Sequence, residues 1–380
     1  MTSTANKKDI RISVSVINDL VTDQRVDKVC RSLQNAGYEV SLTGRKLRKS
    51  PAIQREYKTH RMHLVFNHSF LFYAEFNIRL FFRLLFCKTD IFLSNDTDTL
   101  IANYFASKIR RKPLVFDAHE MFPEMPEVVG RKFVRRFWSA IENRIFPGLK
   151  HCYTVCQSIA DIYNQRYGID MKVVRNIPFA GNVCKNQEYN KKDIFPEFNN
   201  RQILLYQGAV NLGRGIEWII NTMPLLDKYI FYVAGDGDKM QDIQDYVKKI
   251  EMSDRVKFLG RIPFEQLSAY TACADIGISL LENMGLNYFY SLPNRIFDFI
   301  RKNIPILATD FPEIRKIIAH YGVGELVDDY DPNHLATIIR DITARGKNWD
   351  GFAKANAELT WENEANTLLK IVADAALDNT

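Results

Sequence analysis

The chain has no paired cysteine motif and no secretory leader. Its six cysteines stand at positions 30, 87, 152, 156, 184 and 273 without a Cys-x-x-Cys pair, and the opening MTSTANKKDIRIS is polar. Scattered thiols and a polar beginning indicate a reducing compartment, so we expect a cytoplasmic protein.

The sequence also lacks an uninterrupted apolar run. No stretch approaches the roughly 18 uncharged apolar residues of a membrane span, because Glu75, Arg79 and Arg83 interrupt the candidate at 64–87. Apolar residues make up 46% and charged residues 25%, which excludes a mainly disordered or fibrous chain. At 380 residues the chain exceeds the usual size of one domain, so we expect two.

Positive charge is concentrated in the first half. Residues 1–180 carry 29 lysines and arginines against 17 aspartates and glutamates, whereas the remainder carries 22 against 28. A basic first half suits nucleic acid, an anionic membrane surface or phosphorylated acceptors, and charge alone does not choose among them. No zinc-finger, RNP or basic-zipper pattern accompanies the charge, so we do not expect a nucleic-acid partner.

The first half alternates strands with helices, which is typical of a parallel sheet. Residues 10–17 alternate branched apolar residues with small or charged ones, a helix is expected from about Gln24 to Ala36, and a second strand is expected at 38–44. Later strands are expected at 90–94, 113–120, 152–156 and 171–176. The stretch at 64–87 is dense in phenylalanine and is interpreted as a core helix with one polar stripe.

Polar residues follow several of these strands. Asp23 and Arg25 could line a cleft or be a helix cap and a surface arginine, and this loop lacks the Gly-x-Gly-x-x-Gly of a dinucleotide site. His119, which follows Asp117, is a candidate catalytic or substrate-binding group, or a histidine hydrogen-bonded in a loop.

One acidic pair and two histidines are candidate metal ligands. Asp96 and Asp98 could hold a metal with a diphosphate, but such spacing is frequent by chance in a loop that caps a helix. His60 and His63 would point to opposite faces of a strand and form no chelate. We therefore predict no metal site.

Residues 131–145 form a basic amphipathic helix. Arg131, Lys132, Arg135 and Arg136 fall on one side, with Phe133, Val134, Phe137, Trp138 and Ile141 on the other. This pattern suits attachment to an anionic membrane surface, or else a helix packed on the core with solvated basic residues.

The domain boundaries are expected where the alternation of strands and helices is interrupted. We expect a first Rossmann-like domain at 1–176, a linker at 177–202, a second such domain at 203–360, and a helix at 361–380 that crosses back to the first domain.

The second half repeats the alternation and brings four loops together. Gly208, Gly213 and Gly215 permit close approach of the backbone to a ligand, and Arg214 stands among them. The loops at 208–215, 235–238, 260–262 and 282–295 follow strands, so they should gather at one edge of the sheet and form a crevice of nucleotide size.

The last of these loops leads into a helix. Ser291, Leu292 and Pro293 break regular structure before an apolar-periodic run, so a helix should begin near Asn294. An uncapped helix start with Arg295 in its first turn is an anion site suited to phosphate. Asp298 is an acceptor for sugar hydroxyls, although an ordinary capped helix with a solvated aspartate fits the same pattern.

These residues resemble the retaining glycosyltransferases of family 4, which have the GT-B fold, and in particular the bacterial surface-polysaccharide type. The similar motifs are D-x-R-V at 23–26, DAHE at 117–120, YQGAVNLGRGIE, GDGD, VKFLGRIP, ENMGL, SLPNRIFDF and TWENE. The resemblance implies an α/β fold with two doubly wound Rossmann-like domains facing across a cleft.

The resemblance also implies roles for particular residues. Arg214 takes the position that contacts the donor diphosphate, and Asn294 and Arg295 hold the same phosphates from the helix start. Gly208 and Gly213 belong to the same donor-binding set. Asp298 matches the ribose-binding acid, and Glu282 looks like the acid that faces the donor sugar. The base side is lined by Gly235, Gly237, Gly260 and Arg261, and His119 reaches the sugar from the first domain.

The implied activity is transfer of a sugar from a UDP- or GDP-linked donor to a lipid-linked or saccharide acceptor in surface-glycan biosynthesis, without a metal or a further cofactor. Such an enzyme would lie on the inner face of the cell membrane as a peripheral protein. Two departures favour an alternative, a catalytically weak nucleotide-sugar-binding subunit that supports a partner transferase. Ala209 stands where many members have arginine, and Glu282 and Asp298 are sixteen positions apart rather than eight.

Overall fold

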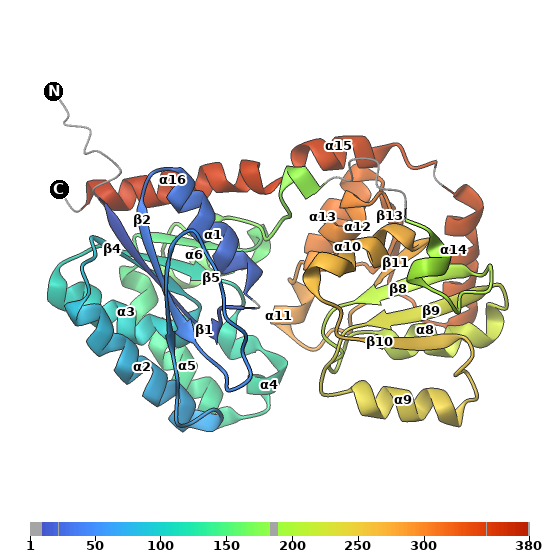
Figure 1. The fold of residues 1–380 in the computed structure, drawn as a ribbon, viewed down its shortest axis with the longest axis horizontal. Helices are drawn as coiled ribbons and strands as arrows, with labels where there is room; N and C mark the ends of the chain where they lie inside the picture. Colours follow the sequence, from blue (N-terminus) through green and yellow to red (C-terminus); the bar gives the residue numbers. More distant parts are fainter. Residues whose placement is uncertain (1–9, 22, 183–188, 347, 379–380) are drawn as a thin grey trace. The chain divides into compact units, whose positions relative to one another are not determined.

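A computed structural model of the chain describes residues 10–21, 23–182, 189–346 and 348–378. The chain divides into two compact units, one of Met1–Asn176 with Asn363–Thr380 and one of Ile177–Glu362. Each unit is a sheet with helices on its faces (Figure 1). In the described ranges no helix is both long enough and apolar enough to cross a membrane.

The first unit contains a parallel sheet with the strand order β3-β2-β1-β4-β5-β6-β7. Its strands are β1 (Arg11–Asp19), β2 (Glu39–Arg45), β3 (Lys58–Met62), β4 (Ile91–Asn95), β5 (Leu114–Ala118), β6 (His151–Thr154) and β7 (Lys172–Val173). Its helices are α1 (Gln24–Asn35), α2 (Ser69–Phe86), α3 (Thr97–Arg110), α4 (Pro126–Val129), α5 (Lys132–Ile145), α6 (Gln157–Tyr167) and, from Asn363 on, α16 (Trp361–Leu377).

The local signals for the first unit are largely confirmed. The Asp23 side chain accepts a hydrogen bond from the Val26 amide and caps α1 at the predicted residue. All five residues of β4 are buried, as in a central parallel strand covered on both faces. The first turn of α16 is tied to this unit by Glu364, whose carboxylate binds Arg175.

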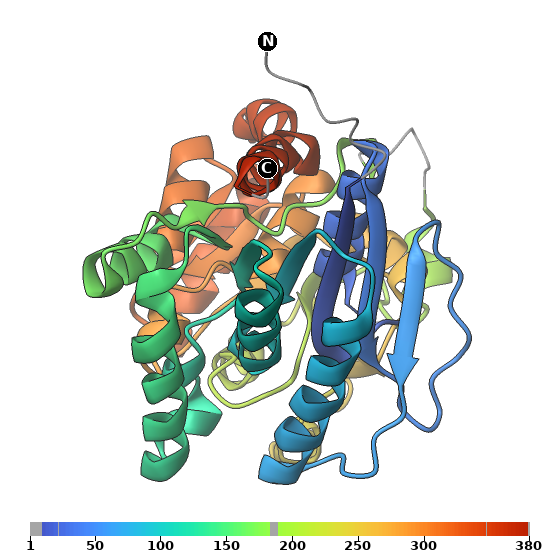
Figure 2. The same ribbon diagram turned by 90° about the vertical axis from the view of Figure 1, so that its left-hand side faces the viewer.

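Helix α2 packs beside α3, and α3 beside α5. Figure 2 turns the first unit toward the viewer and shows the blue α2 next to the teal α3. The inner side of α2 carries Phe72, Phe76, Leu80 and Leu84 into a core shared with β4 and α3. The prediction of a core helix at 64–87 is therefore confirmed for this side.

The second unit contains a parallel sheet with the strand order β10-β9-β8-β11-β12-β13. Its strands are β8 (Gln202–Gln207), β9 (Tyr229–Ala234), β10 (Val256–Gly260), β11 (Ile276–Ser279), β12 (Ile306–Thr309) and β13 (Gly324–Val327). Its helices are α7 (Lys191–Ile194), α8 (Ile216–Thr222), α9 (Met240–Lys249), α10 (Phe264–Cys273), α11 (Leu286–Phe289), α12 (Asn294–Arg301), α13 (Pro312–Tyr321), α14 (Pro332–Arg345) and α15 (Gly351–Glu358).

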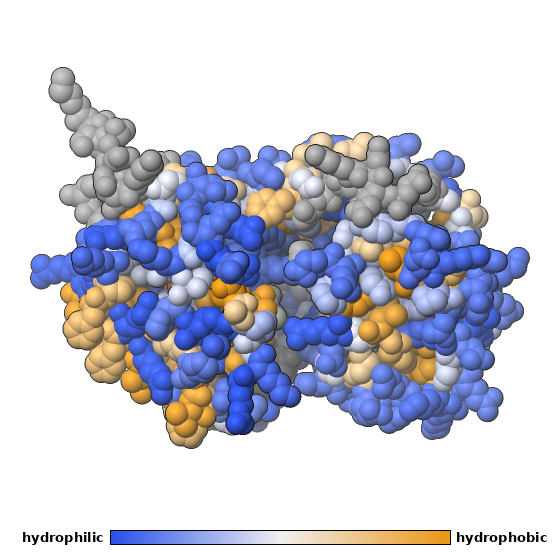
Figure 3. Space-filling model, in the orientation of Figure 1, coloured by the Kyte–Doolittle hydropathy of each residue, from blue (hydrophilic) through white to orange (hydrophobic). Residues whose placement is uncertain are grey.

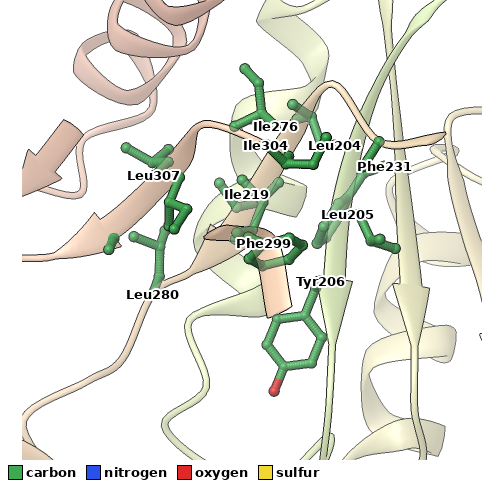
Figure 4. Packing of buried hydrophobic residues seen from close by; sticks show 14 of the residues in the cluster. Leu204, Leu205, Tyr206, Ile219, Phe231, Ile276, Leu280, Phe299, Ile304 and Leu307 are labelled. Carbon is green, nitrogen blue, oxygen red and sulfur yellow. The ribbon is translucent and has the colours of Figure 1, made fainter. Parts of the chain in front are cut away.

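The core of the second unit fixes the position of α12. Phe299 lies among buried residues of β8, β11 and β12, including Leu205 and Leu307 (Figure 4). Its ring covers Gly277 so closely that a Cβ at this glycine would overlap it. Only a residue without a side chain lets α12 approach β11 in this way.

The segment predicted as a linker, 177–202, contributes to the same core. Ile177, Phe195 and Phe198 are buried in the second unit, and α7 lies within the segment. Part of the segment, 183–188, lies outside the described residues.

Candidate functional site

In the second unit, the order of the strands reverses between β8 and β11. The chain proceeds from β8 to β9 and β10 on one side, and continues with β11, β12 and β13 on the other. In open parallel sheets, ligands bind beyond the carboxyl ends of the strands at such a switch point. We therefore expect the loops that follow β8 and β11 to line a ligand-binding site.

These two loops are in direct contact. The Glu282 amide donates to the Gly213 carbonyl at 2.9 Å, and the Tyr288 hydroxyl donates to the Leu212 carbonyl at 3.2 Å. Gly213 has φ of +74°, and a Cβ there would overlap the Met284 side chain. The glycine is thus required both by its left-handed backbone and by the packing of the second loop.

The loops after β9 and β10 complete the same edge. The Gly208 amide donates to Ala234 at 2.9 Å, and the Gly235 amide donates to Gly260 at 2.8 Å. A Cβ at Gly235 would overlap the Gly208 carbonyl oxygen, and one at Gly237 would collide with the Val210 carbonyl. The predicted convergence of the loops at this edge is confirmed by these contacts.

Arg295, in the first turn of α12, is a buried cation. Its guanidinium lies 4.1 Å from the centre of the Tyr206 ring, and its Nη1 atom is buried without a hydrogen-bond partner in the described residues. Burial, with the positive charge of Arg214 acting in the same direction, lowers the pKa of Arg295 below its usual value. An unpaired donor on a buried cation is costly unless a ligand supplies the acceptor.

Arg214 stands beside it on the loop after β8. Its guanidinium lies 4.8 Å from the centre of the Tyr288 ring, and its Nε atom is also buried without a hydrogen-bond partner in the described part of the chain. Within that part, neither Arg214 nor Arg295 forms an ion pair with a carboxylate. Two neighbouring guanidiniums that lie against aromatic rings and keep unused donors have the chemistry that suits an anion.

The start of α12 adds backbone donors to this site. The helix begins at Asn294, as predicted, after Pro293, and no side chain caps it. Asn294 is exposed, and the Ile296 amide already donates to the Pro293 carbonyl at 3.1 Å. The first-turn amides suited to an anion are therefore those of Asn294 and Arg295.

Asp298 lies one turn further along α12 and is half-buried. Its Oδ2 atom accepts from Gln207 Nε2 at 2.9 Å, and Gln207 Oε1 accepts from the Thr271 hydroxyl at 2.8 Å. This chain of bonds orients the carboxylate from the end of β8. The sequence analysis missed Gln207, Tyr206 and Tyr288, although a polar residue ending the apolar run ILLYQ was a usable signal.

Glu282 and Arg261 lie at the edges of the same group of loops. Both side chains are exposed. The backbone of Glu282 is fixed through Gly213, and Arg261 follows Gly260, whose φ of +64° turns the chain after β10. The structure thus brings all the predicted second-half residues to one sheet edge.

In the first unit, His119 is bound by two carboxylates. Its Nδ1 lies 2.9 Å from Asp96 and its Nε2 lies 3.0 Å from Asp117. Burial alone would lower the pKa of His119, but the two carboxylates outweigh burial and raise it well above its usual value. His119 is therefore an imidazolium that donates from both nitrogens, and in this state it has no lone pair with which to accept a proton.

Asp117 is held in turn by Arg25. The guanidinium of Arg25 binds both carboxylate oxygens at 2.9 and 2.8 Å and donates to the Val174 carbonyl at 2.9 Å. Burial would raise the pKa of Asp117, but Arg25 and His119 lower it to about 2. Arg25 is fully enclosed, so the interpretation as a surface arginine is wrong.

Asp96 and Asp98, the two candidate metal ligands, have different surroundings. Asp96 binds His119, whereas Asp98 is buried, and burial followed by the charge of Asp96 raises its pKa well above its usual value. Among the described residues, no group of three or more histidine, cysteine, aspartate or glutamate side chains is arranged to hold a metal ion.

Both halves of the chain match models of known protein families. Residues 201–345 match a family model described as Glycosyl transferases group 1, and residues 23–178 match one described as Glycosyltransferase Family 4. Together these models cover most of the chain, and the chain belongs to the glycosyltransferases.

Individual relatives agree with this assignment. Alpha-monoglucosyldiacylglycerol synthase of Streptococcus pneumoniae is 27% identical over 157 residues, which are 40% of this chain and 33% of that protein. The matched part is thus about a third or less of the length of the curated relatives.

Two solved structures are similar over almost the whole chain. Sucrose-phosphate synthase from Thermosynechococcus elongatus has a TM-score of 0.79 at 16% identity, covering 96% of this chain and 98% of that one. Anabaena HepE in complex with UDP-glucose has a TM-score of 0.75 at 13% identity, covering 96% and 100%. The predicted α/β class, with two Rossmann-like domains of the GT-B type, is confirmed.

Proposed function

We propose that the chain is a retaining transferase that moves a sugar from a UDP- or GDP-linked donor to a lipid-linked or saccharide acceptor in bacterial surface-glycan biosynthesis. The observation that carries this proposal is the pair Arg214 and Arg295, two adjacent cations with buried unpaired donors at an uncapped helix start. A diphosphate is the anion that this arrangement fits, because it presents several oxygens to two guanidiniums and a row of amides.

The site would act mainly on the leaving group. As the bond between the sugar and the diphosphate breaks, negative charge develops on the phosphate oxygens, and the fixed cations and amides stabilise it. Because the chain's own donors supply this charge, we propose a reaction that needs no metal. Asp298, oriented by Gln207, would accept bonds from the ribose hydroxyls.

The remaining residues would complete the donor site. Glu282 would face the sugar, and Arg261 with the neighbouring glycines would border the base. His119 would act toward the sugar as a fixed positive charge, because Asp96 and Asp117 already occupy both of its ring nitrogens. A lipid-linked acceptor lies in a membrane, so we further propose that the protein works as a peripheral protein on the anionic inner face of the cell membrane.

A ligand panel followed by two variants tests this function. Thermal unfolding with UDP, GDP, ADP, CMP and dTDP would identify the base, since a ligand at about 100 times its dissociation constant stabilises by roughly 2.7 kcal/mol. Arg214→Ala and Asp298→Ala should each weaken binding of the selected nucleotide by about 1.5–3 kcal/mol, because each removes a charge-assisted bond.

Transfer of labelled sugar by the isolated chain distinguishes an enzyme from a supporting subunit. Binding without turnover, under conditions where the acceptor is present, would favour the alternative of a weak donor-binding partner. Unchanged affinity in both variants would refute the location of the site.

A further inference from the structure

The outer side of α2 and α3 exposes an unusual number of large apolar side chains. In the described part of the chain, sixteen such side chains are exposed, and nine of them lie between residues 65 and 109. They are Val65, Phe66, Phe70, Leu71, Ile78, Phe82, Phe86, Phe105 and Ile109. Figure 3 shows orange residues gathered at the lower left, over α2 and α3. Clustering of this kind marks an interaction surface.

The exposed residues of α2 form one stripe. Leu71, Ile78, Phe82 and Phe86 follow one another at intervals of seven, four and four residues, which places them on one side of a helix. Phe86 is 82% exposed. Because the core of the unit already covers the opposite side of α2, the stripe is not explained by folding.

The stripe borders a basic cleft of about 610 Å³. The cleft is lined by His60, Arg61, Met62, His63, Arg79, Phe82, Arg83, Phe86 and Cys87. Two of its arginines are already paired, Arg61 with Asp19 at 3.0 Å and Arg79 with Glu75 at 2.6 Å.

Arg83 is the cation in the cleft that lacks a counter-charge. Its Nε donates to the Thr43 hydroxyl at 3.1 Å, and among the described residues it makes no ion pair with a carboxylate. Burial lowers the pKa of Arg83 below its usual value. A partly desolvated arginine between two exposed phenylalanines fits an anionic group attached to an apolar body.

The charge around the stripe points to an anionic partner as well. Residues 58–112 contain nine lysines and arginines against four aspartates and glutamates. Lys88, Lys108 and Arg111 are exposed near the carboxyl ends of α2 and α3. A second copy of this chain would bring the same positive excess to the contact, which opposes self-association through this surface.

We propose that the outer side of α2 and α3 docks on an anionic phospholipid membrane, with a lipid phosphate in the cleft at Arg83 and the stripe of Ile78, Phe82 and Phe86 among the acyl chains. This inference deepens the proposed function, because a lipid-linked acceptor would be reached from the same surface. Exposed cations beside an amphipathic helix side are the features that hold a peripheral protein on such a membrane.

The packing of α5 argues against the predicted membrane attachment through residues 131–145. In α5, Trp138 is buried against Tyr73 and Phe122, with ring centres 5.4 and 4.6 Å apart. Arg135 is bound to Glu124 at 2.7 Å. Only Phe133 of the predicted apolar side is freely exposed, at 83%.

Co-sedimentation with vesicles tests the proposal with the full chain. The parent protein should bind vesicles of phosphatidylcholine with about one third phosphatidylglycerol, bind pure phosphatidylcholine at least about tenfold more weakly, and be released by salt. The double variant Phe82→Ser with Phe86→Ser should lose at least about tenfold of the binding, and so should Arg83→Ser, while Arg83→Lys retains most of it. Phe133→Ser on α5 and Lys248→Ser in the second unit serve as matched controls and should bind like the parent.

Several results would overturn the proposal. Unchanged vesicle binding by the Phe82 and Phe86 variant, or equal binding of the parent to neutral vesicles, would refute the membrane contact. Loss of binding only in Phe133→Ser would place the contact on α5. A dimer that the Phe82 and Phe86 variant abolishes, or binding of inorganic phosphate without binding of vesicles, would show a different occupant. Nucleotide binding, measured on the same variants, should equal that of the parent because none of the changed residues is among the donor-site residues. The melting temperature of the Phe82 and Phe86 variant should also equal that of the parent, because both side chains are exposed. Vesicle binding needs no donor, so its loss is distinguishable from failure of the proposed transfer.

Discussion

Replacing Arg295 by methionine should weaken ligand binding without weakening the fold. The guanidinium is 7% exposed, has no carboxylate partner in the described ranges, and lies near the like charge of Arg214. Methionine keeps much of the side-chain volume against Tyr206. Replacing a buried charge by an apolar group of similar volume is often neutral or stabilising, so the ligand-free melting temperature should stay the same or rise.

The effect on binding has the opposite sign. A lost contact between arginine and diphosphate costs about 1.5–3 kcal/mol, which is roughly ten- to hundredfold in the dissociation constant. If the parent is stabilised by about 2.7 kcal/mol at 100 times its dissociation constant, a thirtyfold weaker variant at the same concentration is stabilised by only about 0.9 kcal/mol. In a domain of this size, each kcal/mol moves the melting temperature by about 2–4 °C.

Differential scanning fluorimetry with and without the selected nucleoside diphosphate measures both effects. Arg301→Met is the matched control, because Arg301 is a buried arginine of the same helix that donates to Asn356 and to the Leu359 carbonyl. That change leaves buried carbonyls unpaired, so it should lower the melting temperature and leave nucleotide affinity unchanged. A variant Arg295→Met that unfolds earlier yet keeps the full ligand-induced shift would refute the anion-site reasoning.

Three further predictions concern charge, packing and metal. Because the folded-state pKa of His119 is raised, the stability it provides is fully present below about pH 6.5 and is lost as pH rises through the folded pKa. The destabilisation caused by His119→Gln should therefore shrink from pH 5 to pH 9 in thermal unfolding, and a constant difference would contradict the ion-pair assignment. Gly235→Ala should lower the melting temperature and nucleotide affinity together, since its Cβ would overlap the Gly208 carbonyl, whereas Gly260→Ala, with open space around it, should cost only about 1 kcal/mol. Excess EDTA should leave sugar transfer nearly intact, and loss of activity with rescue by manganese would instead implicate Asp96 and Asp98.

Local sequence signals were sufficient for the frame of the molecule. The period of apolar residues located α1 and most of the strands, although β3 and β13 were not predicted. The break before Asn294 located the start of α12. Glycines and Arg214 at strand ends located the sheet edge where the loops after β8, β9, β10 and β11 meet. These features can be predicted locally because the backbone conformation of a residue depends mainly on its sequence neighbours. In a parallel sheet, the loops after the strands then come to the same edge.

The state of the side chains depended on residues far away in the sequence. Gln207 and Asp298, 91 positions apart, meet because β8 lies beside the start of α12. His119 is charged because Asp96 and Asp117 enclose it, and Arg295 is deprived of water by Tyr206. In the same way, α2 and α5 both carry exposed-looking apolar residues in sequence, but packing buries Trp138 and leaves Phe86 in solvent. The sequence by itself determined most of the elements, their order and the sheet edge where four loops meet, whereas only the tertiary structure decided which charges are unpaired and which apolar side is left uncovered. Burial and partner choice are set by contacts between distant segments, which no local pattern contains.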